Sequence, residues 1–199
     1  MSAETPRERP ILFNEQMVRA ILEGRKTVTR RAVKPQPDFL GSMVDPNTPF
    51  KTLDAGLHAR ITCPHGQPGD RLWVREAWAA DAQVDAIAPR DLSQGEPIWY
   101  PADFSVRQTG CSMISKGRGR PSIHMPRWAS RILLEITAVR VERLHDLSDP
   151  DVLAEGCSHS EMQSGNSLVS VFARLWQSTG GDWAANPWVW VVEFKRVTP

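Results

Sequence analysis

The chain has few cysteines, a single tyrosine and no long run of apolar residues. Its three cysteines are an odd number at wide spacing among 199 residues, which argues against a secreted, disulfide-bonded protein. No segment approaches the roughly 20 apolar residues of a membrane-spanning helix. The first ten residues are polar and lack the apolar core of a signal peptide. We therefore expect free thiols and a soluble, cytoplasmic protein without a membrane partner.

An excess of charge of either sign is also missing. The formal net charge is +1, which argues against a protein that coats nucleic acid by bulk electrostatics, although a local basic patch stays open. The length of 199 residues suffices for one well-filled core, and we see no internal repeat. We expect a single domain over residues 1–199 and leave the oligomeric state open.

Several common catalytic signatures are absent. The chain contains no glycine-rich phosphate loop of the Walker or Rossmann type. His124 and His145 have no Ser or Cys nucleophile motif around them, which argues against a Ser/His/Asp hydrolase. Cys63 and His65 offer two zinc ligands, but no segment with the flanks of a zinc knuckle completes a four-ligand site. We expect neither a metal nor a cofactor.

The most distinctive segment that is present is the run Gly-Arg-Lys-Thr-Val-Thr-Arg-Arg at residues 24–31. The apolar spacing over residues 14–23 predicts a helix that Asn14 caps and that Gly24 ends. An amine, two hydroxyls and three guanidinium groups follow directly: Lys26, Thr27, Thr29, Arg25, Arg30 and Arg31. These groups suit a reactive or anion-binding loop, and a merely solvated basic segment is the alternative.

Gly24, Lys26 and Arg31 fit the pattern Gly-x-Lys-x-x-Glu-x-Arg, so the loop resembles the signature of ASCH domains of the PUA-like superfamily. Thr29 stands where many members carry Glu. That variant resembles the small bacterial acetylcytidine amidohydrolases, in which a Lys, a Thr and a distant Glu are the catalytic set. The resemblance therefore implies Lys26, Thr29 and Glu155 as catalytic residues, and we expect them to converge in one cleft.

The rest of the chain fits the same family in outline. Residues 68–74 resemble the family's Gly-Asp strand entry, and residues 190–194 resemble its closing strand. We expect an α+β fold, a PUA-like mixed β-barrel with helices at the rim. Strands are predicted near residues 71–78, 97–101, 132–142 and 188–197, and helices near 148–156 and 168–176. Loop-rich insertions without a core of their own are predicted at roughly 36–61 and 79–123.

The loop chemistry suits acyl transfer. A Lys whose pKa is lowered by burial or by neighbouring cations can deprotonate a Thr hydroxyl, which then attacks an amide carbonyl. Thr29 would be the nucleophile or orient a water, Lys26 the base, and Glu155 the acid or orienting carboxylate. The predicted reaction removes an N-acyl group from a nucleobase such as that of acetylcytidine. An ordinary carboxylate at a helix end is the alternative for Glu155.

Seven residues are assigned to substrate binding: Arg25, Thr27, Arg30, Arg31, Glu76, Arg127 and Trp128. Trp128 lies between arginines in sequence, and its indole is expected to stack on a base. Glu76 has an alternative role as the ion-pair partner of Arg71 or Arg75. The basic segment 110–120 is expected to be mobile and to contact phosphate.

Two rival functions remain open. The same residues suit a non-catalytic module that binds RNA or modified nucleic acid, or a ribonuclease in which Lys26 and the arginines stabilise phosphate charge. The partner is thus a nucleoside or a nucleic-acid base, with RNA as the polymeric form. The sequence leaves open which base is bound, and whether as a nucleoside or in a polymer.

Overall fold

The computed structural model describes residues 5–41, 47–108, 110–162 and 166–197. The chain divides into two compact units: unit 1 comprises residues 1–23, 71–134 and 196–199, and unit 2 comprises residues 24–70 and 135–195. Each unit is thus assembled from separate stretches of sequence. Parts of the two predicted insertions, residues 42–46 and residue 109, lie outside the described residues. The expectation of a single domain stays a prediction.

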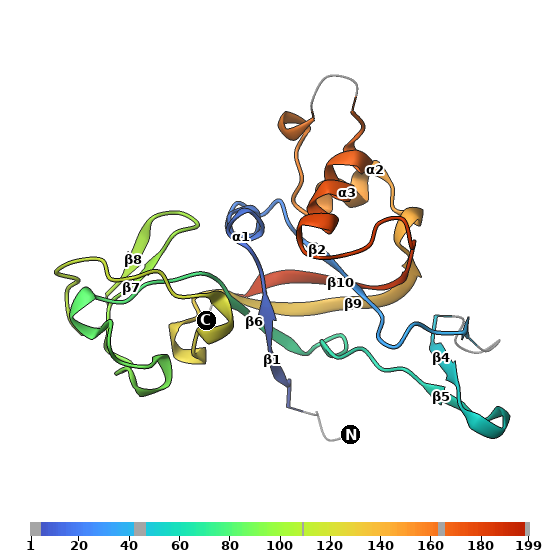
Figure 1. Cartoon of the computed structure of the whole chain (residues 1–199), viewed down its shortest axis with the longest axis horizontal. Helices are drawn as coiled ribbons and strands as arrows, with labels where there is room; N and C mark the ends of the chain where they lie inside the picture. The colour runs from blue at the N-terminus through green and yellow to red at the C-terminus, as the bar shows by residue number, and fades with distance from the viewer. Residues whose placement is uncertain (1–4, 42–46, 109, 163–165, 198–199) are drawn as a thin grey trace. The chain divides into compact units, whose positions relative to one another are not determined.

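Unit 1 contains one helix and two pairs of short strands (Figure 1). Its elements are β1 (Glu8–Leu12), α1 (Glu15–Leu22), β6 (Arg71–Arg75), β7 (Ile98–Tyr100) and β8 (Ser105–Arg107). β1 pairs with β6 in parallel, with Pro10 opposite Trp73. β7 and β8 form an antiparallel hairpin in which Trp99 lies opposite Val106.

Helix α1 forms where the sequence predicts it. The side chain of Asn14 accepts a hydrogen bond of 2.8 Å from the backbone N–H of Met17, which satisfies a donor that the first turn leaves free. Val18 and Ile21 are buried on its apolar face. Gly24 follows with a φ of +76°, a left-handed conformation that costs glycine little.

The second predicted insertion contributes to a buried hydrophobic cluster that it shares with its flanks, since Trp78, Met125 and Ala129 lie outside residues 79–123. The cluster consists of Trp78, Ala80, Leu92, Ile98, Tyr100, Met125 and Ala129. The expectation that the insertions have no core of their own stays a prediction. The segment is loop-rich, as predicted, because it consists largely of 3-10 turns and three-residue strands. Periodicity did not reveal this cluster because the three-residue strand β7 contributes only Ile98 and Tyr100 to it, and the other members come singly from outside regular helices and long strands.

Unit 2 contains two helices, a small three-stranded sheet and the two longest strands of the chain. Its elements are β2 (Val28–Ala32), β3 (Phe39–Leu40), β4 (Pro49–Thr52), β5 (His58–Arg60), most of β9 (Leu133–Arg143), α2 (Asp149–Ala154), α3 (Leu168–Ser178) and most of β10 (Trp188–Val197). β9, β10 and β2 are neighbours in that order, and β3, β4 and β5 form the small sheet.

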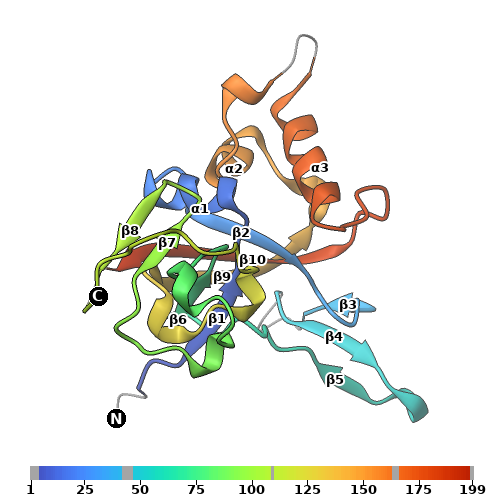
Figure 2. The same cartoon turned by 60° about the vertical axis from the view of Figure 1, so that its left-hand side comes forward.

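The core of unit 2 lies between its helices and two of its strands. Helices α2 and α3 lie over β2 and β10 (Figures 1 and 2). Val28 of β2 and Val191 of β10 are buried in one cluster with Val152 of α2 and Phe172 of α3. This packing holds the C-terminal end of α2 next to the start of β2, where the candidate catalytic residues lie.

The α+β class is confirmed, and a closed barrel is not observed. In neither unit do the described strands close on themselves. The predicted strands appear as β6, β7, β9 and β10, and the predicted helices as α1, α2 and α3. β1, β3, β4, β5 and β8 were not predicted. Among the described residues, no helix has the length and apolar character needed to cross a bilayer.

Candidate functional site

The loop that precedes β2 is bonded to the end of α2 residue by residue. The backbone N–H of Thr27 donates a hydrogen bond of 2.9 Å to the carbonyl of Ala154. The Lys26 ammonium donates to the carbonyl of Glu155 at 2.9 Å. The Arg25 guanidinium donates to the carbonyl of Gly156 at 2.6 Å. The last carbonyls of a helix have no partner within the helix, and cations are favourable there. The loop therefore stabilises the C-terminal end of α2, and it also positions the candidate catalytic side chain of Lys26 there.

The Lys26 ammonium is fully bonded and out of contact with solvent. It donates to the carbonyl of Val28 at 2.7 Å, to the carbonyl of Glu155 at 2.9 Å and to Oε2 of Glu155 at 2.6 Å. Its side chain has a solvent exposure of 0 %. Because an ammonium has three protons, these three acceptors use all of them.

Glu155 comes directly after α2, at its C-cap. The helix begins at a capping box in which the backbone N–H of Ser148 donates to the Asp151 carboxylate at 2.9 Å. At the other end, Oε2 of Glu155 accepts from Lys26 at 2.6 Å and Oε1 accepts from Arg30 at 3.3 Å. Both oxygens of the buried carboxylate are therefore paired with cations.

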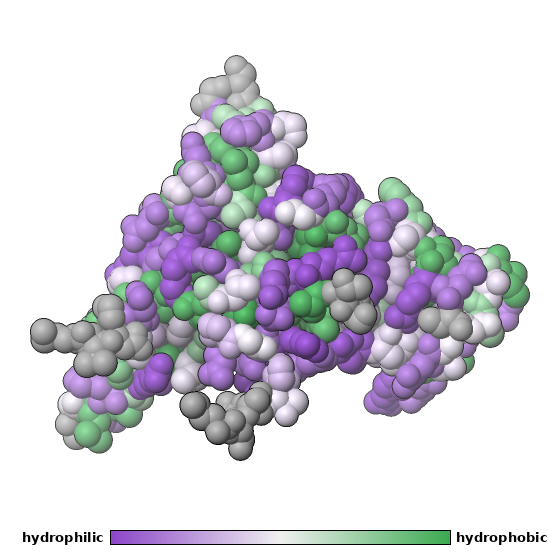
Figure 3. Space-filling model, turned by 180° about the vertical axis from the view of Figure 1, so that it is seen from behind, coloured by the Kyte–Doolittle hydropathy of each residue, from purple (hydrophilic) through white to green (hydrophobic). Residues whose placement is uncertain are grey.

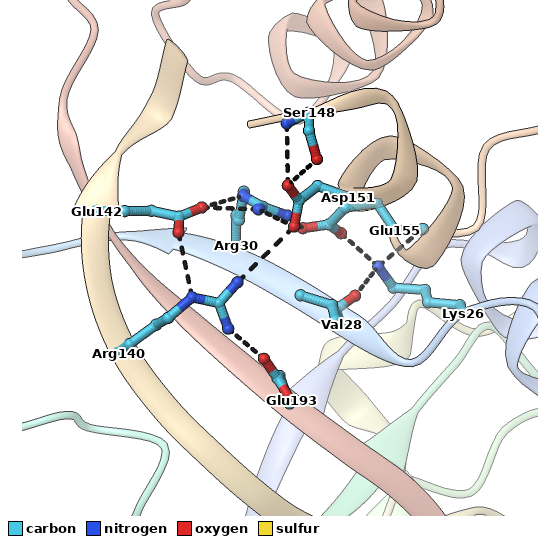
Figure 4. A network of polar contacts seen from close by, with 9 residues as sticks. All are labelled: Lys26, Val28, Arg30, Arg140, Glu142, Ser148, Asp151, Glu155 and Glu193. Atoms are coloured by element: carbon cyan, nitrogen blue, oxygen red, sulfur yellow. Dashed lines mark hydrogen bonds and ion pairs between the residues drawn. The ribbon is translucent and has the colours of Figure 1, made fainter. Parts of the chain in front are cut away.

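Arg30 joins three carboxylates from two other elements (Figure 4). Besides Glu155, its guanidinium lies 2.7 Å from Glu142 of β9 and 3.0 Å from Asp151 of α2. Arg140 extends the network on its more exposed side and pairs with Glu142 at 3.2 Å, with Asp151 at 3.7 Å and with Glu193 of β10. This network fixes the position of the Glu155 carboxylate.

The environment shifts the pKa values of both basic groups. Burial lowers the pKa of the Lys26 ammonium, the Glu155 carboxylate opposes this, and Arg31 lowers it further. Burial also disfavours the charged form of Arg30, but Glu155 and Glu142 outweigh it and raise the Arg30 pKa. Of these two groups, Lys26 is therefore the one that loses its proton more easily in this site than in water.

The structure brings Lys26 and Glu155 together, 129 residues apart in sequence. Thr29 lies on β2 opposite Val192 of β10. Side chains alternate along a strand, so the Thr29 side chain lies on the opposite face of β2 from Arg30. Lys26, Thr29 and Glu155 are each 2 % exposed, so this structure shows the site closed to solvent where a cleft was expected.

Three further predicted binding residues lie on the same loop and strand. Arg25 and Thr27 are exposed and bind the end of α2 as described above. Arg31 is half-buried opposite Trp190 of β10. Burial lowers the pKa of its guanidinium, and Glu155 acts in the opposite direction. Arg31 therefore influences Lys26 and Glu155 electrostatically.

Glu76, Arg127 and Trp128 belong to unit 1. Glu76 is paired with Arg131, with two oxygen–nitrogen distances of 2.9 Å, so the predicted partners Arg71 and Arg75 are wrong. Burial raises the pKa of Glu76, and Arg131 opposes this. A two-bond contact to a planar guanidinium is strong enough to hold a carboxylate that is 1 % exposed.

The other two predicted residues of unit 1 also have partners. Arg127 pairs with Glu8 at 2.9 Å. Trp128 is half-buried against the hydrophobic cluster that the second insertion shares with its flanks, and the Arg107 guanidinium lies 5.7 Å from its ring centre. A cation thus already contacts the indole that was expected to stack on a base.

The basic segment 110–120 is tied down along its second half, contrary to expectation. The Asp81 carboxylate accepts from the N–H groups of Ile114 at 2.6 Å and Ser115 at 3.3 Å. The N–H of Gly117 donates to the carbonyl of Ala80 at 2.9 Å, and that of Arg118 donates to Asp85 at 3.0 Å. The proposal of a mobile, phosphate-gripping loop therefore loses its basis.

Four residues of the network were not predicted: Arg140, Glu142, Asp151 and Glu193. Asp151 lies within the helix predicted near residues 148–156, but nothing in the sequence indicated its contact with Arg30. Alternating charges at Arg140 and Glu142 on β9 were the only sequence signal, and such charges usually mark a solvated face. No cluster of three or more metal-ligand side chains occurs within the described part of the chain.

A scan against protein-family models and searches of curated proteins and of solved structures find no match for this chain. The function is therefore argued from the site and from the loop motif.

Proposed function

We propose that the chain is an amidohydrolase of the ASCH type, with a PUA-like fold, that removes an N-acyl group from a nucleobase such as that of acetylcytidine. The observation that carries this proposal is the buried contact of 2.6 Å between Lys26 and Glu155. The loop motif implies this pair, although 129 residues separate its members. The cysteine usage supports a cytoplasmic location as part of the same proposal.

The reaction needs Lys26 in its neutral form. In the closed structure Thr29 lies on the opposite face of β2 from Arg30, so the proposal requires the loop to move and bring the Thr29 hydroxyl to Lys26. The amine then takes the hydroxyl proton of Thr29, and the Thr29 oxygen attacks the acyl carbon. The carbon–nitrogen bond breaks, and the departing exocyclic nitrogen takes a proton from the protonated Glu155 carboxyl. Water then hydrolyses the ester on Thr29 and releases the acid. In the second version of this proposal Thr29 orients a water that attacks directly.

The contacts of Lys26 indicate how the neutral amine arises. All three ammonium protons are bound, so one must leave, and Oε2 of Glu155 at 2.6 Å is a carboxylate acceptor within direct reach. The lowered pKa of Lys26 favours that transfer. The same step gives Glu155 the proton that the leaving group needs. Because the side chains are buried, substrate entry requires the loop to move away from them.

A second candidate is a non-catalytic module that binds RNA or modified nucleic acid. The observation that favours it over the hydrolase is that the Thr29 side chain lies on the opposite face of β2 from Arg30, which contacts Glu155. A ribonuclease is the third candidate and uses the cations of the loop to stabilise phosphate charge. Neither alternative requires the hydroxyl of Thr29 to react.

A screen of N-acylated nucleosides and short RNAs with product detection tests the proposal. We expect acid release from an acylated cytidine, and a loss of turnover of at least about 100-fold in both Lys26→Ala and Thr29→Val. Thr137→Val is the matched control, because Thr137 is an exposed residue of strand β9 to which no role in the site is assigned. Absence of acid release from every acylated nucleoside contradicts the hydrolase, and cleavage of RNA identifies the ribonuclease.

A further inference from the structure

The β7–β8 hairpin of unit 1 carries aromatic residues on its outward face. Ile98 and Tyr100 of β7 point into the hydrophobic cluster that the insertion shares with its flanks and are 0 % and 1 % exposed. Trp99 between them points outward and is half-buried. Its cross-strand neighbour Val106 is 42 % exposed. A hairpin needs apolar residues only on its core face, so the outward Trp99 calls for another explanation.

Phe104 closes the hairpin in a conformation that a bulky residue rarely adopts. Its φ is +61°, in the left-handed region, and its side chain is 74 % exposed. Its ring centre lies 6.1 Å from that of Trp99, at a tilt of 46°. Backbone strain of this kind costs on the order of 1–3 kcal/mol and clusters at functional sites. The hydrophobic cluster does not need this ring, because the ring is mostly in solvent.

A cation is held over the same surface. The Lys116 ammonium lies 4.1 Å from the Trp99 ring centre. Lys116 is exposed, but its backbone is fixed by a bridge to Asp81 and by the bond between Gly117 and Ala80. These bonds fix the backbone from which the Lys116 side chain extends over Trp99, which reduces the backbone entropy lost on binding.

The segment that follows the hairpin turn is basic, and two of its arginines are already paired: Arg127 with Glu8, and Arg131 with Glu76 and Asp103. Residues 104–134 contain six Lys and Arg residues and no Asp or Glu. The neighbouring Asp103 carboxylate is occupied, because it pairs with Arg131 at 2.7 Å and accepts from Ser105. On the space-filling surface, hydrophobic residues lie among hydrophilic ones on the lobe at the right of Figure 3. Aromatic rings beside fixed cations suit bases joined by phosphates.

We infer that the outward face of the hairpin, formed by Trp99, Phe104, Val106 and Lys116, binds single-stranded nucleic acid. A base stacks on the exposed ring of Phe104, and Lys116, which lies over the Trp99 ring, contacts a phosphate of the same strand. This surface uses none of the residues of the proposed hydrolase site and does not depend on that function. Base stacking is sequence-tolerant, so the surface accepts DNA and RNA strands of mixed sequence.

The test measures the fluorescence anisotropy of labelled single strands of about 16 nucleotides, a length within the range bound by known single-strand modules. We expect Phe104→Gly to weaken binding by about tenfold, the scale of one lost base stack. Glycine accepts a positive φ, so this variant keeps or raises the melting temperature and separates binding from folding. We expect Lys116→Met to weaken binding and to reduce the salt dependence by about one phosphate contact.

Two controls make the outcome decisive. Ile123→Ala removes another exposed apolar side chain of unit 1, 58 % exposed, and we expect it to bind like the wild type. Lys51→Met removes a cation of an exposed ion pair outside the proposed hydrolase site, and we also expect it to keep full affinity. The inference is overturned if the wild type does not bind the strands, if Phe104→Gly binds as tightly as the wild type, or if either control loses as much affinity.

Discussion

At the scale of single residues, the role of Lys26 depends both on the sequence motif that identified it and on the contacts that the folded chain gives it. The motif identified the residue, but its three acceptors and its partner Glu155 come from the folded chain. Lys26 donates to the Glu155 carboxylate, which can accept its proton, and it also donates to the Glu155 carbonyl at the end of α2. Its chemical and structural roles must therefore be separated by measurements other than turnover.

The pH dependence of Lys26 provides one such measurement. Its folded-state pKa lies below the ordinary 10.5, so the folded state binds this proton less tightly than the unfolded state does. The free energy of unfolding should therefore rise as the pH rises through the folded pKa towards 10.5. We expect this rise in urea titrations of the wild type and not in Lys26→Met. In the hydrolase, kcat/KM should fall over the same range, because the proton that Lys26 passes to Glu155 for the leaving group is then lost to solvent.

The control for that experiment is Lys51→Met. Lys51 pairs with Asp38 at 2.6 Å, but both side chains are 38 % exposed. Replacing it should leave the alkaline rise intact, because an exposed pair is well solvated. Equal loss of the rise in both variants would show that the effect does not come from Lys26.

Arg30 should dominate the stability of the network. Its side chain is 0 % exposed and contacts the carboxylates of Glu142, Asp151 and Glu155. Arg30→Met leaves the buried Glu155 with one cation fewer, and we expect a loss of about 3 kcal/mol in the free energy of unfolding. Arg140→Met removes a cation that is 34 % exposed, and we expect a loss below about 1 kcal/mol. Equal losses in urea unfolding would contradict this ranking.

At the scale of elements, local signals decided which helices and strands could be predicted. α1 and α2 have caps and glycine stops in sequence, and β9 and β10 are 11 and 10 residues long with clear strand patterns. β1 and β4 contain Pro10 and Pro49, which favour a turn or loop assignment. Both pair with partners that sequence alone does not reveal. A short strand is specified by its neighbour more than by its own residues.

Helix α2 offers a test of this coupling between an element and the site. The Asp151 carboxylate accepts from the N–H of Ser148 at 2.9 Å and pairs with Arg30 at 3.0 Å. Burial raises its pKa, but the bonds from Ser148 and Arg30 outweigh this and hold the pKa below the ordinary 3.8. Its stabilising contribution is therefore present above about pH 4 and is lost as the pH falls further.

We expect Asp151→Asn to lower the free energy of unfolding by about 1–2 kcal/mol at neutral pH, the range for a lost cap and a partly exposed ion pair. The difference from the wild type should shrink in titrations below about pH 4, where the wild-type carboxylate becomes protonated. A difference that stays constant down to about pH 2 would assign the effect to packing rather than to charge.

At the scale of the whole molecule, the site could be predicted only in part. The loop at residues 24–31 and Glu155 were identified from a motif, whereas Glu142, Arg140 and Glu193 were not. Glu142 contacts Arg30, and Arg140 contacts Glu193, because β9, β10 and β2 are neighbours in that order in one sheet. Sequence patterns locate residues on elements, but the order of strands decides which charges meet.

The two proposals together make a prediction about polymeric substrates. A strand held at the hairpin raises the effective concentration of its own bases around the rest of the protein. An acylated cytosine within a single strand should therefore be deacylated at a lower KM than the free nucleoside. Phe104→Gly should raise the KM for the strand and leave kcat/KM for the nucleoside unchanged, because Phe104 contacts only the polymer. Steady-state kinetics on both substrates measures this, and an equal change on the two would refute the link between the hairpin and the reaction.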